Sequence, residues 1–98
     1  MQIREIYEEL KEGNFCKSAY AFSRDYMNKD RSYYSVLIAR KKEPSMEAWV
    51  MLNFTLQRLE LNLHTSGSEQ LHEKAAILGS LQSAVSSVIA SKCMANIR

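Results

Sequence analysis

Residues 18–45 read SAYAFSRDYMNKDRSYYSVLIARKKEPS, and this stretch decides the fold that the sequence predicts. Ser18 can cap a helix, because its side chain can accept a hydrogen bond from a free amide of the first turn. Asn28 tolerates the left-handed backbone conformation that a tight turn between helices often needs. Asp30 or Ser32 can cap the next helix, and Pro44 is predicted to end it. The stretch therefore predicts two short helices joined by a tight turn.

The inward faces of these two helices follow from their apolar residues. The second helix of the chain has an inward side that includes Ala21, Phe22, Tyr26 and Met27. The third has an inward side made by Tyr34, Leu37 and Ile38. The residues between these positions are expected to lie on the outward faces of the two helices.

Apolar residues also recur at helical spacing on both sides of the pair. The first segment has one such stripe, formed by Ile3, Ile6, Tyr7 and Leu10, and a stop at Gly13 and Asn14. After Ser45 a second stripe contains Ala48, Trp49, Leu52, Leu56, Leu59 and Leu63. A polar break follows at residues 64–68, and Ser68 is expected to start the last helix. The apolar stripe of that helix contains Leu71, Ala75, Leu78, Leu81, Val85, Val88 and Ile89.

No run of residues alternates apolar and polar side chains as a half-buried strand would, and the chain has only three glycines and one proline. We therefore expect an all-α protein, a four- to five-helix bundle that contains a helix-turn-helix and has a long C-terminal helix. Residues 1–63 are expected to form the helix-turn-helix domain. Residues 68–96 are expected to form a C-terminal helix that either completes the core or pairs with a second copy.

The totals for the chain favour one small domain. It has 98 residues, of which 46% are apolar, so a core can form without metals or disulfides. Cys16 and Cys93 lie in no metal-binding spacing and are expected to be reduced thiols. The charged N-terminus lacks the apolar region of a signal peptide, and polar residues interrupt residues 76–94 too often for a membrane span. We expect a cytoplasmic protein with no membrane partner.

Catalytic and metal-binding patterns are not found in the sequence. His64 and His72 lie eight residues apart across the polar break and are expected to be unliganded. The four acidic residues of the first segment follow helical spacing and are expected to form its solvated face: Glu5, Glu8, Glu9 and Glu12. No nucleophile set, phosphate loop or cofactor fingerprint can be assembled. We therefore expect no enzyme activity, no metal and no cofactor.

Positive charge is concentrated in the middle of the chain. The net charge is +2, but residues 15–44 carry seven basic and three acidic side chains. Residues 1–14 carry two basic and four acidic side chains, and residues 45–98 carry four of each. A localised basic region is what a protein that contacts a phosphate backbone would have.

The same stretch resembles the helix-turn-helix core of the lambda-repressor-like, or XRE, family of DNA-binding domains. The matching residues are Ser18 at the cap, Phe22 and Ser23 in mid-helix, Asn28 at the turn, Tyr34 and Leu37 inward on the third helix, the basic residues Arg40, Lys41 and Lys42, and Pro44 with Ser45 before the fourth helix. The match covers about thirty residues. It implies a small transcriptional regulator that binds double-stranded DNA.

Two features depart from that family pattern. Asn28 replaces the turn glycine and Lys29 the apolar residue after it, and the interval from Phe22 to the third helix is one residue longer. Two registers of the third helix, one residue apart, are therefore compatible with the sequence. The departures, the modest net charge and the aromatic Tyr33 also fit an alternative, a protein-interaction module such as an antiactivator or adaptor that keeps the fold and does not bind DNA.

The residues expected to contact DNA fall into two groups. Outward residues at the start of the third helix can reach base edges in the major groove: Arg31, Ser32, Tyr33, Ser35 and Val36. Other residues are expected to contact phosphates and fix the orientation of the protein: Lys17, Ser18, Lys29, Arg40, Lys41 and Lys42. Because one short helix reads few base pairs, a homodimer on two half-sites is expected. Small residues on the last helix would allow close approach of two copies: Ala75, Gly79, Ala84 and Ala90.

Overall fold

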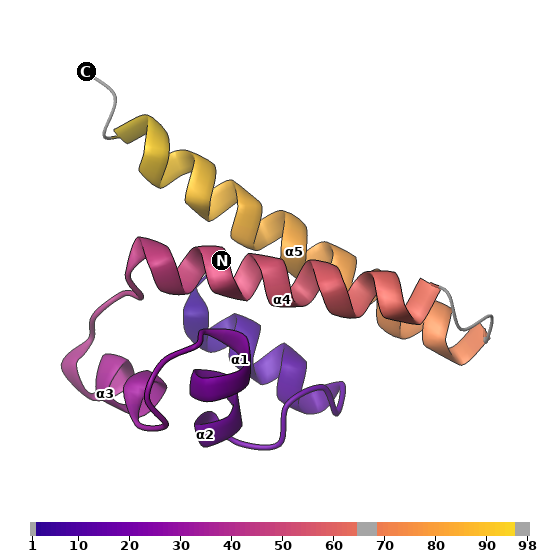
Figure 1. The fold of residues 1–98 in the computed structure, drawn as a ribbon, viewed down its shortest axis with the longest axis horizontal. Coiled ribbons are helices and arrows are strands. Elements are labelled where there is room, and N and C mark those ends of the chain that lie inside the picture. Colours follow the sequence, from indigo (N-terminus) through magenta and orange to yellow (C-terminus); the bar gives the residue numbers. More distant parts are fainter. Residues whose placement is uncertain (1, 65–68, 96–98) are drawn as a thin grey trace.

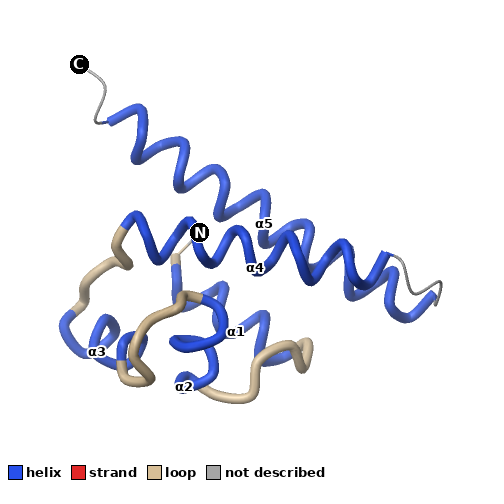
Figure 2. The backbone as a smooth tube through the Cα atoms, in the orientation of Figure 1, coloured by secondary structure: helices blue, strands red, loops and turns tan. Residues whose placement is uncertain are grey.

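The computed structural model describes residues 2–64 and 69–95, and these residues are helical outside their connecting loops (Figure 1, Figure 2). In chain order the elements are α1 (Ile3–Glu12), α2 (Ala19–Ala21), the π-helical segment η1 (Phe22–Tyr26), α3 (Tyr33–Arg40), α4 (Met46–His64) and α5 (Glu69–Ala95). Within the described ranges there is no strand, so the prediction of an all-α fold with a long C-terminal helix is confirmed.

The helices form two groups that share α4. Figure 1 shows α1, α2 and α3 gathered on one side of α4, while α5 runs back along α4 in the opposite direction. One cluster of buried side chains connects both groups, because it includes residues of α1, η1, α4 and α5. The helix pair and the long C-terminal helix are therefore packed on a common core.

The sequence of α1 explains both its position and its end. Ile3, Ile6 and Leu10 are buried, whereas the four glutamates predicted to be solvated are exposed. Asn14 has a φ of 61°, and the Phe15 N–H donates to the Leu10 carbonyl at 2.9 Å. This is the Schellman arrangement that ends many helices, with asparagine in the place usually taken by glycine. The predicted stop is confirmed.

The interface between α4 and α5 is apolar and continuous. Trp49, Leu52 and Leu56 of α4 are almost completely buried. On α5 the predicted residues Ala75, Leu78, Leu81 and Val85 have no exposed surface. Burying one large apolar side chain contributes about 1.5–3 kcal/mol, so this face of α5 contributes substantially to the stability of the fold. One face of α5 therefore completes the core of the chain.

Polar contacts between α4 and α5 also fix how these helices pack. Ser86 Oγ donates to Asn53 Oδ1 at 3.0 Å. A Cβ atom added at Gly79 would lie 3.1 Å from Oε1 of Glu60, so this glycine permits the close approach of the helices. Two of the small residues predicted for a dimer contact, Ala75 and Gly79, thus face α4 of the same chain.

Some predicted features fall outside the described part of the chain. They are residues 65–68 of the polar break, including the helix start at Ser68, and the side chains of His64, Leu71 and His72. In the described ranges, none of the helices has the length and hydropathy needed to span a membrane. Cys16 and Cys93 are both free thiols, and burial raises the pKa of the Cys16 thiol.

The second helix contains a π-helical segment. Ser18 caps it as predicted, since Ser18 Oγ accepts a hydrogen bond from the Ala21 N–H at 3.2 Å. α2 then continues directly into η1, whose wider π-type turn contains one residue more than an α-helical turn. This segment accommodates the extra residue between Phe22 and the third helix.

Ser23 connects the two short helices. Its side chain has no exposed surface, and its Oγ donates to the Ala19 carbonyl at 2.9 Å. The same oxygen accepts a hydrogen bond from the Tyr34 N–H, also at 2.9 Å. That N–H belongs to the first turn of α3, where amides have no partner within their own helix. The hydroxyl of Ser23 therefore fixes the start of α3 against the second helix.

Aromatic rings surround this hydrogen bond. The ring of Phe22 lies 5.3 Å from the rings of both Tyr7 and Tyr34, measured between centroids. Tyr26 donates its hydroxyl hydrogen to the Phe15 carbonyl at 2.6 Å, and burial raises the pKa of Tyr26 to about 12. Aromatic pairs at such distances stabilise a core beyond the area they bury. The inward side of the helix pair is therefore packed against aromatic rings and joined to the loop before α2 by the Tyr26 hydrogen bond.

We predict that Ser23→Ala destabilises the protein by about 1–3 kcal/mol, because the buried Tyr34 N–H loses its acceptor. The matched control is Ser35→Ala on the exposed face of α3, which should change stability by less than about 0.5 kcal/mol. Urea denaturation followed by circular dichroism measures both. Equal stability of the two variants would contradict the role assigned to Ser23.

Candidate nucleic-acid interface

The turn before α3 has the conformation that the sequence predicted. Asn28 has a φ of 53°, in the left-handed region. Asp30 then accepts two hydrogen bonds through Oδ2, from the Ser32 N–H at 3.1 Å and from the Ser32 hydroxyl at 2.6 Å. These bonds lower the pKa of Asp30, the hydroxyl having the larger effect. Of the two predicted capping residues, Asp30 thus accepts the amide hydrogen bond at the start of α3.

The faces of α3 follow the predicted inward register. Tyr34 and Leu37 are buried and Ile38 is half-buried. Four of the residues predicted to reach base edges are exposed at the start of the helix: Arg31, Ser32, Ser35 and Val36. Tyr33 differs, since it is half-buried and its hydroxyl accepts a hydrogen bond from the Ser45 N–H at 3.0 Å. Tyr33 therefore joins α3 to the start of α4.

Two cations near the turn have aromatic neighbours. The guanidinium of Arg31 lies 5.3 Å from the centre of the Tyr20 ring, and both residues are exposed. Tyr20 was not among the residues predicted to contact DNA. It lies in the first turn of the second helix and is not one of the inward apolar residues, so the sequence already suggests an outward side chain. A cation held over a ring face loses less freedom when it binds a ligand. Tyr20 therefore positions Arg31.

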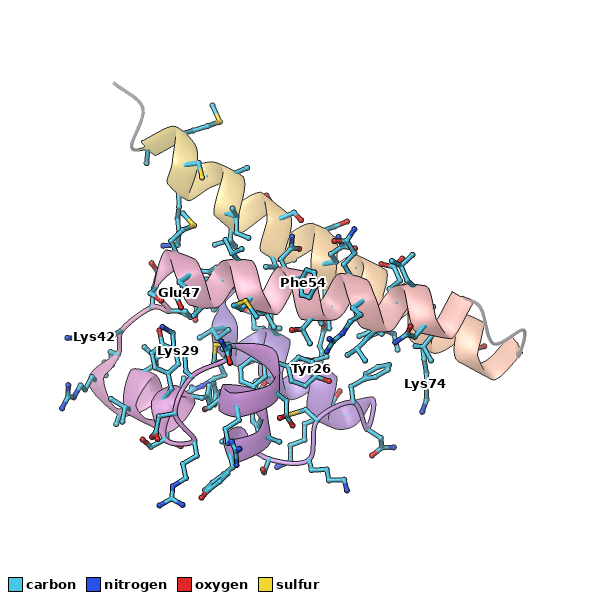
Figure 3. The ribbon with its side chains drawn as sticks, viewed as in Figure 1. Tyr26, Lys29, Lys42, Glu47, Phe54 and Lys74 are labelled. Atoms are coloured by element: carbon cyan, nitrogen blue, oxygen red, sulfur yellow. The ribbon has the colours of Figure 1, made fainter. Side chains whose placement is uncertain are left out.

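Lys29 is paired within the chain. Its Nζ lies 3.6 Å from Oε1 of Glu47 and 5.8 Å from the centre of the Tyr33 ring. Figure 3 shows Lys29 and Glu47 near each other, between the turn and the first residues of α4. The carboxylate neutralises much of the lysine charge at this place. Lys29 consequently contributes less positive charge to the surface than the sequence suggested.

The end of α3 differs from the prediction. The helix was expected to continue to Pro44, but it ends at Arg40. Lys41 has a φ of 54°, and the Lys42 N–H donates to the Leu37 carbonyl at 2.9 Å. These are the features of a Schellman motif with lysine at the left-handed position. Hydrogen bonds of the backbone therefore end α3 well before the proline.

The early end of α3 places three cations together at the edge of the molecule. Arg40, Lys41 and Lys42 are all exposed, and Lys42 extends outward from the loop in Figure 3. Glu43, the next residue, is bound to Lys92 of α5 at 2.8 Å. Because that carboxylate is paired with another lysine, it offsets less of the charge of its neighbours. A positive region lies beside the C-terminal end of α3.

The predicted site residues thus divide into four sets, one of which comprises the exposed, uncharged residues Ser32, Ser35 and Val36. Lys29 and Tyr33 make contacts within the chain, and Ser18 serves as a helix cap. Exposed cations for which no ion pair is found among the described residues are Lys17, Arg31, Arg40, Lys41 and Lys42. Exposed cations thus outnumber exposed acidic residues in this part of the chain, and the acidic Asp25 and Asp30 lie close to Arg31 in the sequence.

The protein is an all-α domain in which a capped helix pair presents a partly exposed α3 with basic residues before it and at its C-terminal end. It belongs to a family described as Family of unknown function (DUF6626), whose model matches residues 3–98. Comparison with curated proteins gave no match, and comparison with solved structures gave none either. The resemblance of residues 18–45 to the lambda-repressor-like domains remains a prediction from the sequence.

Lys41→Gly should stabilise the fold by about 1 kcal/mol, because glycine adopts the left-handed conformation without the steric cost that a side chain has there. Lys42→Gly is the matched control. It removes the same charge at a residue without positive φ, so it should bring no gain in stability. Thermal unfolding of both variants measures the difference. A midpoint no higher for Lys41→Gly than for Lys42→Gly would contradict this account of the end of α3.

Proposed function

We propose that this protein binds double-stranded DNA with α3 in the major groove and regulates transcription by occupying an operator. The observation that carries the proposal is the exposed start of α3, where Arg31, Ser35 and Val36 face away from the core. Behind them, Ser23 and the aromatic rings hold the helix in a fixed position. Base readout in the major groove requires a rigid helix with an exposed first turn and polar or basic side chains at or just before its start, as Ser35 and Arg31 provide here.

The surrounding cations support the proposal. Arg40 ends α3 and is followed by Lys41 and Lys42, whereas Lys17 precedes α2, so cations lie at the two ends of the helix pair in the sequence. Contacts from both sides to phosphates would fix the orientation of α3 in the groove. Arg31, held beside Tyr20, is placed at the start of α3 and can donate two hydrogen bonds to a guanine.

A homodimer is part of the proposal, and α5 is the element that best suits it. Residues 75–95 contain one charged residue, Lys92, which is bound to Glu43. The face opposite the core consists of exposed small and apolar residues: Ala76, Ser80, Ser83, Ser87, Ala90, Ser91 and Met94. Charged residues are depleted at the centres of interfaces, and small side chains let two helices approach closely. We propose that a second copy packs on this face, which we name the outer face of α5.

The DNA-binding prediction has two parts with different readouts. Arg31→Ala should weaken binding to the preferred site by about 1–3 kcal/mol and relax base preference, because it removes a base contact. Lys42→Ala should weaken binding to all DNA sequences by the same factor, and it should reduce the slope of log affinity against log salt concentration by about 1. Fluorescence polarisation with duplexes selected from a random library measures both.

The matched control for these variants is Arg58→Ala, an equal change of charge on α4. It should leave affinity, base preference and the salt slope unchanged. If the wild-type protein shows no binding tighter than micromolar at low salt, the proposal fails.

For the dimer, we predict that Ser87→Glu weakens self-association by at least about tenfold. The symmetry of a homodimer places the new charge in the interface twice, and burying an unpaired charge is unfavourable. Ser35→Glu adds the same charge on α3 and should leave self-association unchanged. Sedimentation equilibrium gives both dissociation constants. A wild-type protein that remains monomeric at about 100 μM, where weak dimers are populated, would contradict a homodimer.

A second candidate function is supported by a different surface. Val50, Phe54 and Leu61 are exposed on α4 at spacings of four and seven residues, which places them along one face of the helix. Exposed aromatic and aliphatic residues in a row suit a protein partner, as in an antiactivator or adaptor. Asp30 at the start of α3 would also disfavour DNA there. Recovery of one stoichiometric protein partner that Phe54→Ser abolishes, without retention of DNA, would favour this function.

A further inference from the structure

A cleft of about 380 Å³ lies between the start of α1, the end of α3 and the loop that leads into α4. Its lining comes from parts of the chain that are distant in sequence: Ile3 and Arg4 from α1, Leu37 from α3, Lys41 and Lys42 after it, and Trp49 from α4. Its volume is within the range of sites that bind small molecules. The base-reading residues of α3 do not line it.

The charged groups around the cleft favour an anion. Arg4, Lys41 and Lys42 supply three cations. Glu43 is the acidic residue of the lining, and its carboxylate binds Lys92 at 2.8 Å. Since Lys92 pairs with that carboxylate, cations outnumber unpaired acidic groups among the residues that line the cleft.

The remaining lining of the cleft includes apolar side chains and the nearly buried Trp49. Ile3, Leu37 and Pro44 are buried residues that contribute to the lining. Trp49 is 2% exposed, and its Nε1 has no hydrogen-bond partner among the described residues. An indole N–H can only donate, and leaving such a group unpaired costs about 1–3 kcal/mol. This N–H is buried, so Trp49 forms part of the wall of the cleft and its indole is not a ligand contact.

We propose that the cleft binds a small organic anion, a carboxylate attached to an apolar body. The carboxylate interacts with Lys41, Lys42 and Arg4, and the apolar body lies on the buried side chains of the lining. A free phosphate shares the anionic chemistry but gains nothing from apolar surface. The ligand class is therefore set by charge and apolar contact together.

The cleft also has a consequence for DNA binding, and this part alone rests on the proposed function. Lys41 and Lys42 are proposed to contact phosphates, so a carboxylate held by them would compete with DNA. The ligand would then act as an effector that lowers DNA affinity. Binding to the cleft itself requires no DNA and can be measured on the free protein.

The experiment uses Trp49, the one tryptophan of the chain, as its reporter. Its indole N–H gives a single, assignable signal in the nitrogen-15 correlation spectrum. The probes are benzoate, its neutral counterpart benzamide, and inorganic phosphate. We expect benzoate to shift the indole signal saturably, benzamide to bind at least about fivefold more weakly, and phosphate to leave the signal in place. No saturable shift with benzoate, equal binding of benzamide, or an equal shift with phosphate would overturn the proposal.

Matched variants locate the bound anion. Lys42→Gln and Arg4→Gln should each weaken benzoate binding by about threefold or more, because each removes one cation from the lining. Arg58→Gln makes the same change of charge on α4 and should leave benzoate affinity unchanged. Equal affinities of all three variants would overturn the assignment to this cleft. If benzoate binds but DNA affinity is the same with and without it, the effector role fails while the binding site stands.

Discussion

The hydroxyl group of Ser23 is the constraint on which the arrangement of the helix pair depends. It is buried, it donates to Ala19 in its own helix, and it accepts from Tyr34 at the start of α3. An extra residue in an α-helix would rotate everything after it by about 100°. The π-helical segment η1 absorbs that residue and keeps Ser23 directed at α3. The π-helical segment and the fixed start of α3 are thus connected through Ser23.

The other elements divide into a supporting part and an exposed part. α1, η1 and α4 supply the buried rings and aliphatic side chains behind α3, and one face of α5 closes the core. Arg31 and Val36 in front of α3 remain exposed, and basic residues follow its C-terminal end. Because its outward side is exposed, α3 is the element that we propose contacts DNA. The proposed second copy would pack on the outer face of α5.

The sequence predicted those features that depend on neighbouring residues. Helical periodicity identified the buried faces, and the cap at Ser18 and the left-handed turn residue Asn28 follow from local backbone chemistry. It did not predict the pairing of Lys29 with Glu47, which depends on how α4 meets the turn. It also placed the end of α3 at Pro44, because lysine at a left-handed position is uncommon and gives no signal. A contact with a distant helix decided the first of these features, and a local backbone conformation that lysine does not signal decided the second.

The most direct test of the account is a titration of the nitrogen-15-labelled protein with a duplex selected for binding, followed residue by residue in its amide spectrum. We predict that the largest shifts lie at the start of α3, from Arg31 to Val36, with smaller ones at Lys17 and at residues 40–42, and that the indole of Trp49 is unaffected at low DNA concentration. Shifts confined to α4 and α5, or no shifts at all, would contradict the claim that α3 reads DNA.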